Sequence, residues 1–371
     1  MRIASFNVEN LFSRAVAMNL ESWADGKAVL ERYVRFNKLI QNQHYTPANK
    51  REMLEILEFL GLSKSDIAPF AILRQNRMKL VKRPKGKPVE VIVNGRGDWT
   101  GWLELNTEPV NEVATQNTAR VIKALNADIL GVVEAEDRIA LRRFNEQVLK
   151  GVGGAPYEYA MLIDGNDDRG IDVGLLTRKE NEIISMRSHV DDRALNGGRV
   201  FSRDCPEYEV RLASGKSIWV LVNHLKSKGY GTADKSNKRR LEQAQRVRDI
   251  YDQLLARGIK HVAILGDLND TPESVQLAPL LENASGLKDV SVHPNYEDDG
   301  RPGTYANGTK GSKIDYILLS PELFARVGKA AVFRKGVWGG KNGALWEIFP
   351  EMTGAHEAAS DHAAIWADID I

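Results

Sequence analysis

The sequence predicts a mixed α/β (α+β) protein, because strand-like and helix-like segments both recur along the chain. Apolar runs at residues 129–133, 218–222 and 262–265 have the length and composition of fully buried strands. Residues 28–40 and 47–60 instead carry apolar side chains at helical spacing. A fold with both sheets and helices is therefore expected.

Composition limits the class of protein. The chain has 371 residues, of which 43% are hydrophobic and 27% charged, which is enough to bury a large core. A net charge of +1 provides no overall field for holding a polyanion, so affinity for nucleic acid has to come from local patches. The single cysteine, Cys205, excludes an internal disulfide and favours a reducing compartment. Because no apolar run approaches the roughly 18 residues of a membrane span, we expect a cytoplasmic protein without a membrane partner. The oligomeric state stays open.

The rest of the chain is organised around residues 262–272. The apolar run ends so that Asp267 and Asn269, two positions apart, emerge on one side at the C-terminal edge of the strand. Taken alone, this segment fits an Asx turn in which Thr271 caps a helix that starts at Pro272. The alternative is that a carboxylate and an amide beside a dry sheet bind a cation or a phosphate. Polar residues at neighbouring strand ends would favour the second interpretation.

Five other predicted strands do carry polar side chains at or near one end. These side chains belong to Asn7, Glu9, Glu134, His224, Asp315, Asp361 and His362. Each of them alone is more often structural than catalytic, as an isolated histidine at a strand end usually is. Their joint occurrence at strand ends makes coincidence implausible.

The order and local sequence of these motifs resemble the endonuclease/exonuclease/phosphatase superfamily, which includes pancreatic deoxyribonuclease and bacterial AP endonucleases. The matching segments are 5–12 (Ser-Phe-Asn-Val-Glu-Asn-Leu-Phe), 132–134 (Val-Val-Glu), 223–227 (Asn-His-Leu-Lys-Ser), 266–269 (Gly-Asp-Leu-Asn), 313–316 (Lys-Ile-Asp-Tyr) and 360–362 (Ser-Asp-His). The resemblance covers residues 1–12 and about 109–371. It implies a four-layer sandwich, in which two mixed β-sheets pack face to face with helices outside.

Residues 13–106 are then expected to be an insertion in a single catalytic domain that spans residues 1–371. The insertion would lie between the first strand and the first core helix, and we expect it to be mainly helical with a hairpin. Residues 74–87 of this segment contain seven lysines and arginines and no acid. Contact with nucleic acid is one interpretation of this stretch, and a solvated hairpin edge protected by lysines is the other.

The residue types suit the hydrolysis of a phosphate ester. This reaction needs charge neutralised on the phosphoryl oxygens, an in-line water that has lost its proton, and a stabilised leaving oxygen. Glu134 and Asp361 are hard oxygen ligands suited to Mg²⁺ or Mn²⁺, and Asn7 and Glu9 lie close enough in sequence to assist.

The resemblance also implies catalytic roles. His362, oriented by Asp315, would activate or position the nucleophile, and Asp267 would help to activate water or protonate the leaving group. The choice of base and acid between His362 and Asp267 stays open. The other residues that the resemblance assigns to catalysis are Asn269 and His224, which would hold phosphate oxygens, and Asp172, which would orient His224.

A basic segment follows His224 and could guide a phosphate chain. Its candidate substrate-binding residues are Lys226, Lys228, Arg239 and Arg240. We therefore expect a divalent-metal-dependent phosphodiesterase that acts on nucleic acid, as an endonuclease or exonuclease with DNA favoured. The alternative is a phosphomonoesterase or an inositol or lipid phosphodiesterase of the same superfamily. A third hypothesis is a non-catalytic binding module.

Overall fold

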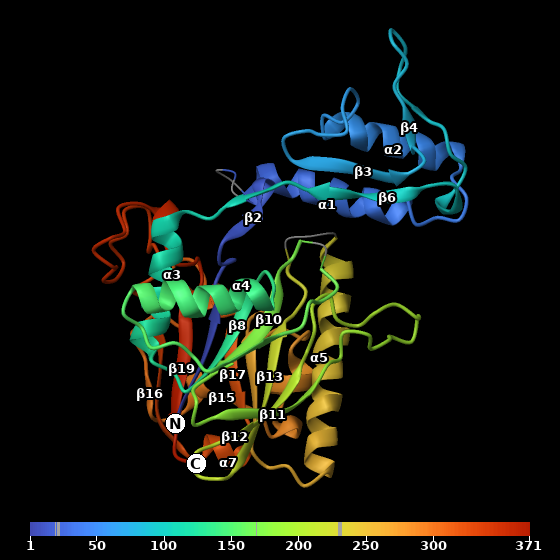
Figure 1. The fold of residues 1–371 in the computed structure, drawn as a ribbon. Helices are drawn as coiled ribbons and strands as arrows, with labels where there is room; N and C mark the ends of the chain where they lie inside the picture. Colours follow the sequence, from blue (N-terminus) through green and yellow to red (C-terminus); the bar gives the residue numbers. More distant parts are fainter. Residues whose placement is uncertain (19, 21–22, 168, 229–231) are drawn as a thin grey trace. The chain divides into compact units, whose positions relative to one another are not determined.

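The computed structural model describes residues 1–371 apart from residues 19, 21–22, 168 and 229–231. Its contacts divide the chain into two compact units (Figure 1). The larger unit comprises Met1–Phe12, Val110–Lys228 and Thr232–Ile371, and the smaller one comprises Ser13–Pro109. The second boundary thus lies at Pro109 instead of residue 106. That the smaller unit is an insertion into a single catalytic domain stays a prediction.

Two mixed sheets form the larger unit in the described residues. The first has the strand order β16-β18-β19-β1-β8-β10-β9, with β16 at Tyr296–Glu297, β18 at Val327–Phe333, β19 at Ala364–Ile369, β1 at Arg2–Asn7, β8 at Ile129–Ala135, β10 at Asp172–Thr177 and β9 at Tyr159–Leu162. The second has the order β11-β12-β13-β14-β17-β15, with β11 at Glu182–Arg187, β12 at Glu207–Arg211, β13 at Ser217–His224, β14 at Val262–Asp267, β17 at Asp315–Leu319 and β15 at Lys288–Asp289. In each sheet a parallel pair, β1 with β8 and β13 with β14, is flanked by antiparallel strands.

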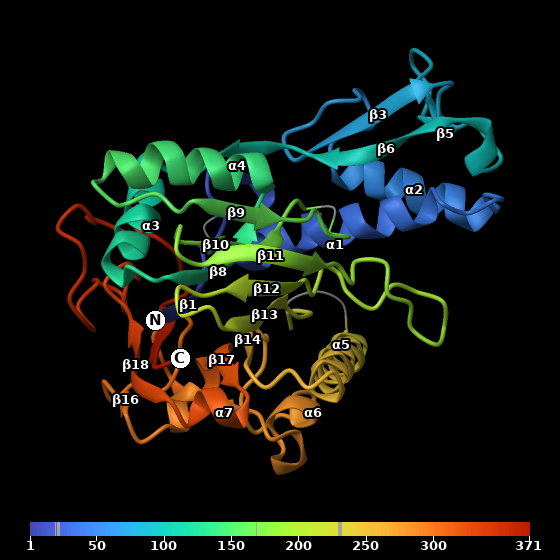
Figure 2. The ribbon, with the colours of Figure 1, turned by 60° about the horizontal axis from the view of Figure 1, so that its bottom comes forward.

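Alternating side chains show how the layers are built. Along β14, Ala263 and Leu265 join the core between the two sheets, whereas Val262 and Ile264 pack on the helix side. The first sheet is covered by α3 (Glu112–Leu125) and α4 (Arg138–Arg143), and the second by α5 (Ala233–Ala256) and α6 (Ala278–Leu281) (Figure 2). The short helix α7 is formed by Pro321–Phe324. This is the expected four-layer α/β sandwich.

The helix expected to start at Pro272 is not formed, which corrects the sequence prediction. Residues 271–277 instead make two turns, in which the Ser274 amide donates to the Thr271 carbonyl and the Leu277 amide donates to the Ser274 carbonyl. Helix α6 begins only at Ala278. Val275 is exposed and Leu277 is the one buried residue of this stretch, so a helix here would bury little apolar surface.

The smaller unit has a hydrophobic core of its own, which includes Leu30, Phe36, Leu57 and Trp99. Two helices, α1 (Trp23–Leu39) and α2 (Pro47–Phe59), pack with two-stranded sheets. The strand pairs are β3 (Ala71–Arg77) with β6 (Thr100–Leu105), β4 (Val81–Lys82) with β5 (Glu90–Val91), and β2 (Ser13–Ala15) with β7 (Thr107–Pro109). The β2–β7 pair places the two ends of this unit side by side.

Candidate active site

The register of the second sheet aligns three of the predicted site residues in one row. His224 at the end of β13 lies opposite Asp267 on β14, and Asp267 lies opposite Asp315 on β17. Side chains directly opposite one another on neighbouring strands project from the same face of a sheet. Residues more than 40 positions apart in the sequence therefore meet at one edge of this sheet.

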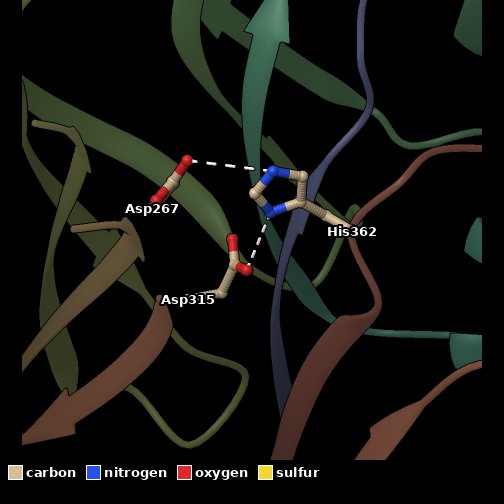
Figure 3. Close-up of side chains that lie close together, drawn as sticks. All are labelled: Asp267, Asp315 and His362. Carbon is tan, nitrogen blue, oxygen red and sulfur yellow. Dashed lines mark hydrogen bonds and ion pairs between the residues drawn. The ribbon is translucent and has the colours of Figure 1, made fainter. Parts of the chain in front are cut away.

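His362 stands between two carboxylates of this row (Figure 3). Its Nδ1 lies 2.8 Å from Oδ2 of Asp315, and its Nε2 lies 4.0 Å from Oδ2 of Asp267. The Thr304 hydroxyl donates to the same Asp315 oxygen at 2.6 Å, which fixes the carboxylate. Burial lowers the pKa of His362, but the charge and hydrogen bond of Asp315 outweigh it and raise this pKa well above its ordinary value. The histidine is thus a charged group with a fixed ring orientation.

Asp267 is buried and surrounded by nitrogen atoms. Asn269 donates two hydrogen bonds to Asp267. Its backbone amide donates to Oδ1 at 2.8 Å, and its side-chain Nδ2 donates to Oδ2 at 3.1 Å. The Asn7 amide group lies 3.5 Å from the same Oδ2. Burial, followed by the charge of Asp315, raises the pKa of Asp267. A carboxylate with a raised pKa can accept a proton near neutral pH.

The chain leaves the strands at this edge through unusual backbone. Glu9, Glu134 and Asn269 have positive φ angles of 49°, 67° and 56°, in the left-handed region. This conformation costs about 1–2 kcal/mol for a residue with a side chain, and it recurs at functional sites. Glu9 also bridges two segments, because its Oε2 accepts the Asp361 amide at 3.1 Å while its own amide donates to Oδ1 of Asn7. Three of the predicted metal-side residues, Asn7, Glu9 and Asp361, are thus joined by hydrogen bonds.

Oxygen-rich groups at this edge fit a divalent cation. Asp267, Asp315 and His362 offer one ligand atom each within 4.8 Å of one another. The predicted ligand Glu134 lies outside that group, with Oε1 3.5 Å from Nε2 of His224. Burial, and then the charges of Arg203 and Arg169, lower the pKa of His224 well below its ordinary value, so this histidine is neutral. It therefore contributes no positive charge toward the Glu134 carboxylate, which leaves a hard anionic ligand suited to a metal ion.

Asp172 does not orient His224, contrary to the sequence expectation. The Asp172 carboxylate accepts the Gly165 amide at 2.8 Å. Within the described residues, Nδ1 of His224 has no hydrogen-bond partner. Burial raises the pKa of Asp172 to about 7. Asp172 thus holds the loop at Gly165, which the spacing of the motifs did not indicate.

A buried cationic group beside His224 was missed by sequence reasoning. Arg203 and Arg169 converge on the Asp167 carboxylate, with Nη2 to Oδ2 distances of 3.1 and 2.6 Å. Their positive charges act on His224 and Lys226, and the charge of Arg203 also acts on Glu134 and Asp267. No local pattern separates Arg203 from an ordinary surface arginine, because it precedes β12 in an irregular segment.

The basic segment after His224 is partly structural, which corrects the expectation that all four cations bind substrate. Asp270 pairs with Lys228 at 2.5 Å and with Arg240 at 2.9 Å. The Arg240 side chain is fully buried and also donates to the Lys226 carbonyl. Arg239 is half-buried on α5, and burial lowers its pKa. Lys226, two residues after His224, is acted on by the charges of Arg203 and Arg169, which also act on His224.

The fold and this site define a class of hydrolases that act on phosphoric esters. The chain belongs to the endonuclease/exonuclease/phosphatase family, whose model matches residues 77–334. That match ends before Asp361 and His362, so their place in the site rests on the geometry. No helix in the part of the chain that the structure describes could cross a lipid bilayer.

One of the similar solved structures shares the fold with a TM-score above 0.5. The mannosyl-6-phosphatase of Bacteroides thetaiotaomicron is 17% identical with a TM-score of 0.51, over 70% of this chain and 92% of that one. An endonuclease/exonuclease/phosphatase family protein from the same organism is 16% identical with a TM-score of 0.49, over 69% and 88% of the two chains. The human Nocturnin catalytic domain is 15% identical with a TM-score of 0.47, over 71% and 88%. No curated protein sequence matches the chain.

Proposed function

We propose that the protein is a divalent-metal-dependent phosphodiesterase that hydrolyses nucleic acid, with DNA favoured. The observation that carries the proposal is the row of His224, Asp267 and Asp315 at one sheet edge, completed by the oriented His362. An oriented charged histidine, a proton-accepting carboxylate and nearby cations are the parts that phosphoryl transfer requires.

His362 acts as a donor in this proposal. Because Nδ1 is bonded to Asp315, the proton on Nε2 is available to a phosphoryl oxygen that enters between His362 and Asp267. A charged imidazole fixed in this way stabilises the negative charge that develops in the transition state. Thr304 maintains the arrangement through its hydrogen bond to Asp315.

Asp267 accepts a proton from the attacking water. The two hydrogen bonds from Asn269 hold the carboxylate in one orientation while its raised pKa makes it a competent base. The water oxygen forms the new bond to phosphorus as the bond to the leaving oxygen breaks. Asn7, Glu134 and the Glu9–Asp361 pair would hold Mg²⁺ or Mn²⁺, which supplies positive charge to the phosphoryl and leaving oxygens.

Arg203, Arg169 and Lys226 supply positive charge for the bound phosphate. The Nε atom of the buried Arg203 has no hydrogen-bond partner within the described residues, so a donor remains available. Burial, and then the charges of Arg203 and Arg169, lower the pKa of Lys226 to about 7. A bound anionic phosphate would offset the mutual repulsion of these cations.

The lowered pKa of Lys226 predicts a pH effect. Lys226 is charged below pH 7 and neutral above it, so kcat/KM is expected to fall as pH rises through about 7. Lys226→Arg keeps the charge at higher pH and should move this descending limb upward, whereas Lys226→Met should raise KM below pH 7 and remove the limb. Steady-state kinetics between pH 5.5 and 9 measure the limb. A limb that stays in place in Lys226→Arg would assign it to another group.

A panel of substrates tests the proposed function. The purified protein is incubated with Mg²⁺ or Mn²⁺ and with supercoiled plasmid, linear duplex, single-stranded DNA, abasic duplex, RNA, inositol phosphates and sphingomyelin. Metal-dependent cleavage of nucleic acid that is absent from Asp267→Asn is the expected result. Turnover of the small phosphoesters alone, with no nucleic acid cleaved, would overturn the proposal.

A phosphomonoesterase is the second candidate. The cationic group of Arg203, Arg169 and Lys226 concentrates positive charge in a buried place, which suits the two negative charges of a terminal phosphate. The neighbour from Bacteroides thetaiotaomicron described as a mannosyl-6-phosphatase shares only the fold at 17% identity. Release of inorganic phosphate from sugar phosphates, added to the same panel, would favour this candidate.

A further inference from the structure

Residues 77–91 of the smaller unit form a hairpin, here called the basic hairpin, in which two kinds of cation can be separated. Arg83 is structural: its guanidinium pairs with Asp66 at 2.6 Å and donates to the carbonyls of Leu62, Ser63 and Ser65. Just before the hairpin, Arg74 likewise pairs with Glu104. These two arginines are engaged in holding the fold.

The remaining five cations of this stretch are exposed and make no ion pair within the described residues. They are Arg77, Lys79, Lys82, Lys85 and Lys87. Glu90 is the one acid of the hairpin, and it lies opposite Lys82 in the strand register. Such an excess of exposed positive charge repels itself unless an anionic partner neutralises it.

The basic hairpin is held firmly at its base. Leu80, Val81 and Val91 are buried in the core of the smaller unit. The Gln75 side chain accepts the Leu80 amide at 2.8 Å and donates to Asp66. The strands therefore leave the unit in a fixed direction, and the hairpin projects beyond α1 and α2 of the same unit (Figure 1).

The tip of the basic hairpin is a tight turn that presents lysines to solvent. The Lys87 amide donates to the Pro84 carbonyl at 3.2 Å, and Gly86 between them has a φ of 74°, as a type II turn requires. Nothing lies within 4 Å of the place where a Gly86 Cβ would be, so the turn is open to solvent. Lys85 and Lys87 flank this glycine. A preorganised display of cations loses little entropy when it binds.

We propose that the basic hairpin binds the phosphate backbone of nucleic acid. This inference rests on the proposed function and deepens it, because it assigns a substrate-binding element outside the catalytic row. A two-stranded ribbon has the width that the major groove of DNA admits, and lysines on it can reach phosphates on either side. The turn sequence Pro-Lys-Gly-Lys-Pro has no large apolar side chain of the kind that membrane-inserting elements carry. Nucleic acid is therefore the polyanion that fits.

Trp99 cannot stack on nucleic-acid bases, because its side chain is buried in the smaller unit. Its ring is 1% exposed, and its Nε1 donates to the Tyr45 hydroxyl at 3.0 Å. Trp102 is 42% exposed on β6. Trp102 lies opposite Arg74 in the β3–β6 pair and outside the basic hairpin, so the binding that we propose for the hairpin is electrostatic, with little dependence on sequence.

The test measures binding separately from cleavage, with matched charge changes. In a full-length Asp267→Asn background, Lys82, Lys85 and Lys87 are changed to Gln. The control changes Lys38, Arg51 and Lys64 to Gln, three exposed cations of the same unit that make no ion pair within the described residues. Fluorescence anisotropy with a labelled 20-base-pair duplex is followed between 50 and 200 mM NaCl, and thermal melting checks the fold of each variant.

The hairpin variant should raise Kd at least about tenfold at low salt. It should also reduce the salt slope by up to about three, because each of the three lysines that no longer neutralises a phosphate lowers the slope by about one. The control variant should change Kd less than about twofold. Hydrolysis of bis-p-nitrophenyl phosphate by the hairpin variant with Asp267 intact should be unchanged, because the basic hairpin takes no part in the chemistry.

Other outcomes overturn the inference in distinguishable ways. Equal losses in the hairpin and control variants would show general charge attraction. Unchanged binding in the hairpin variant, with nucleic acid still cleaved by the unmodified protein, would reject the hairpin and leave the proposed function standing. An unmodified protein that hydrolyses bis-p-nitrophenyl phosphate but neither binds nor cleaves nucleic acid would reject both. Hairpin-dependent binding to phosphatidylserine vesicles without binding to duplex would replace nucleic acid by a membrane surface.

Discussion

Replacing His362 by alanine is expected to lower kcat by about 10³-fold, and combining this change with Asp315→Asn should lower it little further. The reason is the 2.8 Å contact between Nδ1 of His362 and Oδ2 of Asp315, which makes the two side chains one unit. Asp315→Asn alone leaves a histidine whose charge and ring orientation are no longer fixed. The decrease in kcat caused by Asp315→Asn should therefore approach the decrease caused by His362→Ala.

Kinetics and NMR both test whether His362 and Asp315 act as one unit. Single-turnover rates of both single variants and the double variant give the coupling free energy, and losses that multiply to about 10⁶-fold would contradict the paired unit. In the metal-free protein, imidazole NMR should place the pKa of His362 above the ordinary value of about 6.5, and Asp315→Asn should lower it. Asp298→Asn, a change at an exposed acid outside the site, serves as the control and should alter neither quantity.

The strand-end residues were predictable because a short apolar run fixes both the strand and the position where it ends. The runs at 129–133 and 262–265 fall inside β8 and β14, and Glu134 and Asp267 lie at or next to their C-terminal ends. The helix expected from Pro272 was wrong because capping residues alone do not make a helix without an apolar face to bury. Local pattern thus predicts the end of a strand better than the conformation of the segment after it.

Pairing between distant polar groups was not predictable. Asp172 bonds to the Gly165 amide, and Arg203 joins Arg169 at Asp167, and neither arrangement follows from sequence spacing. Arg240 shows the same limit, because a cation in a basic segment is buried against Asp270. A sequence specifies charge, whereas the partner of that charge depends on how loops from different strands converge.

The structure therefore changes which cations are candidates for substrate contact. Lys228 and Arg240 neutralise Asp270, and Arg83 supports the base of the basic hairpin. The remaining candidates for substrate contact are Arg203 and Lys226 near the catalytic row and the exposed lysines of the basic hairpin. In the proposed function, the first pair would act on the phosphate that reacts, and the second group would act on phosphates elsewhere along the same polymer.

Glu134→Gln is expected to remove metal-dependent turnover while leaving the fold intact. Glutamine keeps the volume and the left-handed backbone of residue 134, but it removes the charge that a divalent cation needs. Loss of a direct ligand should weaken metal binding by at least the 10–100-fold that is typical when an outer-shell partner is lost. Isothermal titration with Mn²⁺ and hydrolysis of bis-p-nitrophenyl phosphate with and without chelator measure the two effects.

This last experiment also decides between the two groups that could hold the ion. Asp267, Asp315 and His362 have ligand atoms within 4.8 Å of one another, whereas Glu134 stands outside that group. If Glu134→Gln binds Mn²⁺ normally and Asp315→Asn does not, the ion belongs to the buried group and the assignment of Glu134 is wrong. Glu158→Gln, which changes an exposed acid beside β9, is the control for the removal of one negative charge. Oδ2 of Asp315 already accepts hydrogen bonds from His362 and Thr304, so a metal ion at that oxygen would compete with both, whereas no such pair of bonds is made by the Glu134 carboxylate within the described residues, and we therefore expect the loss in Glu134→Gln.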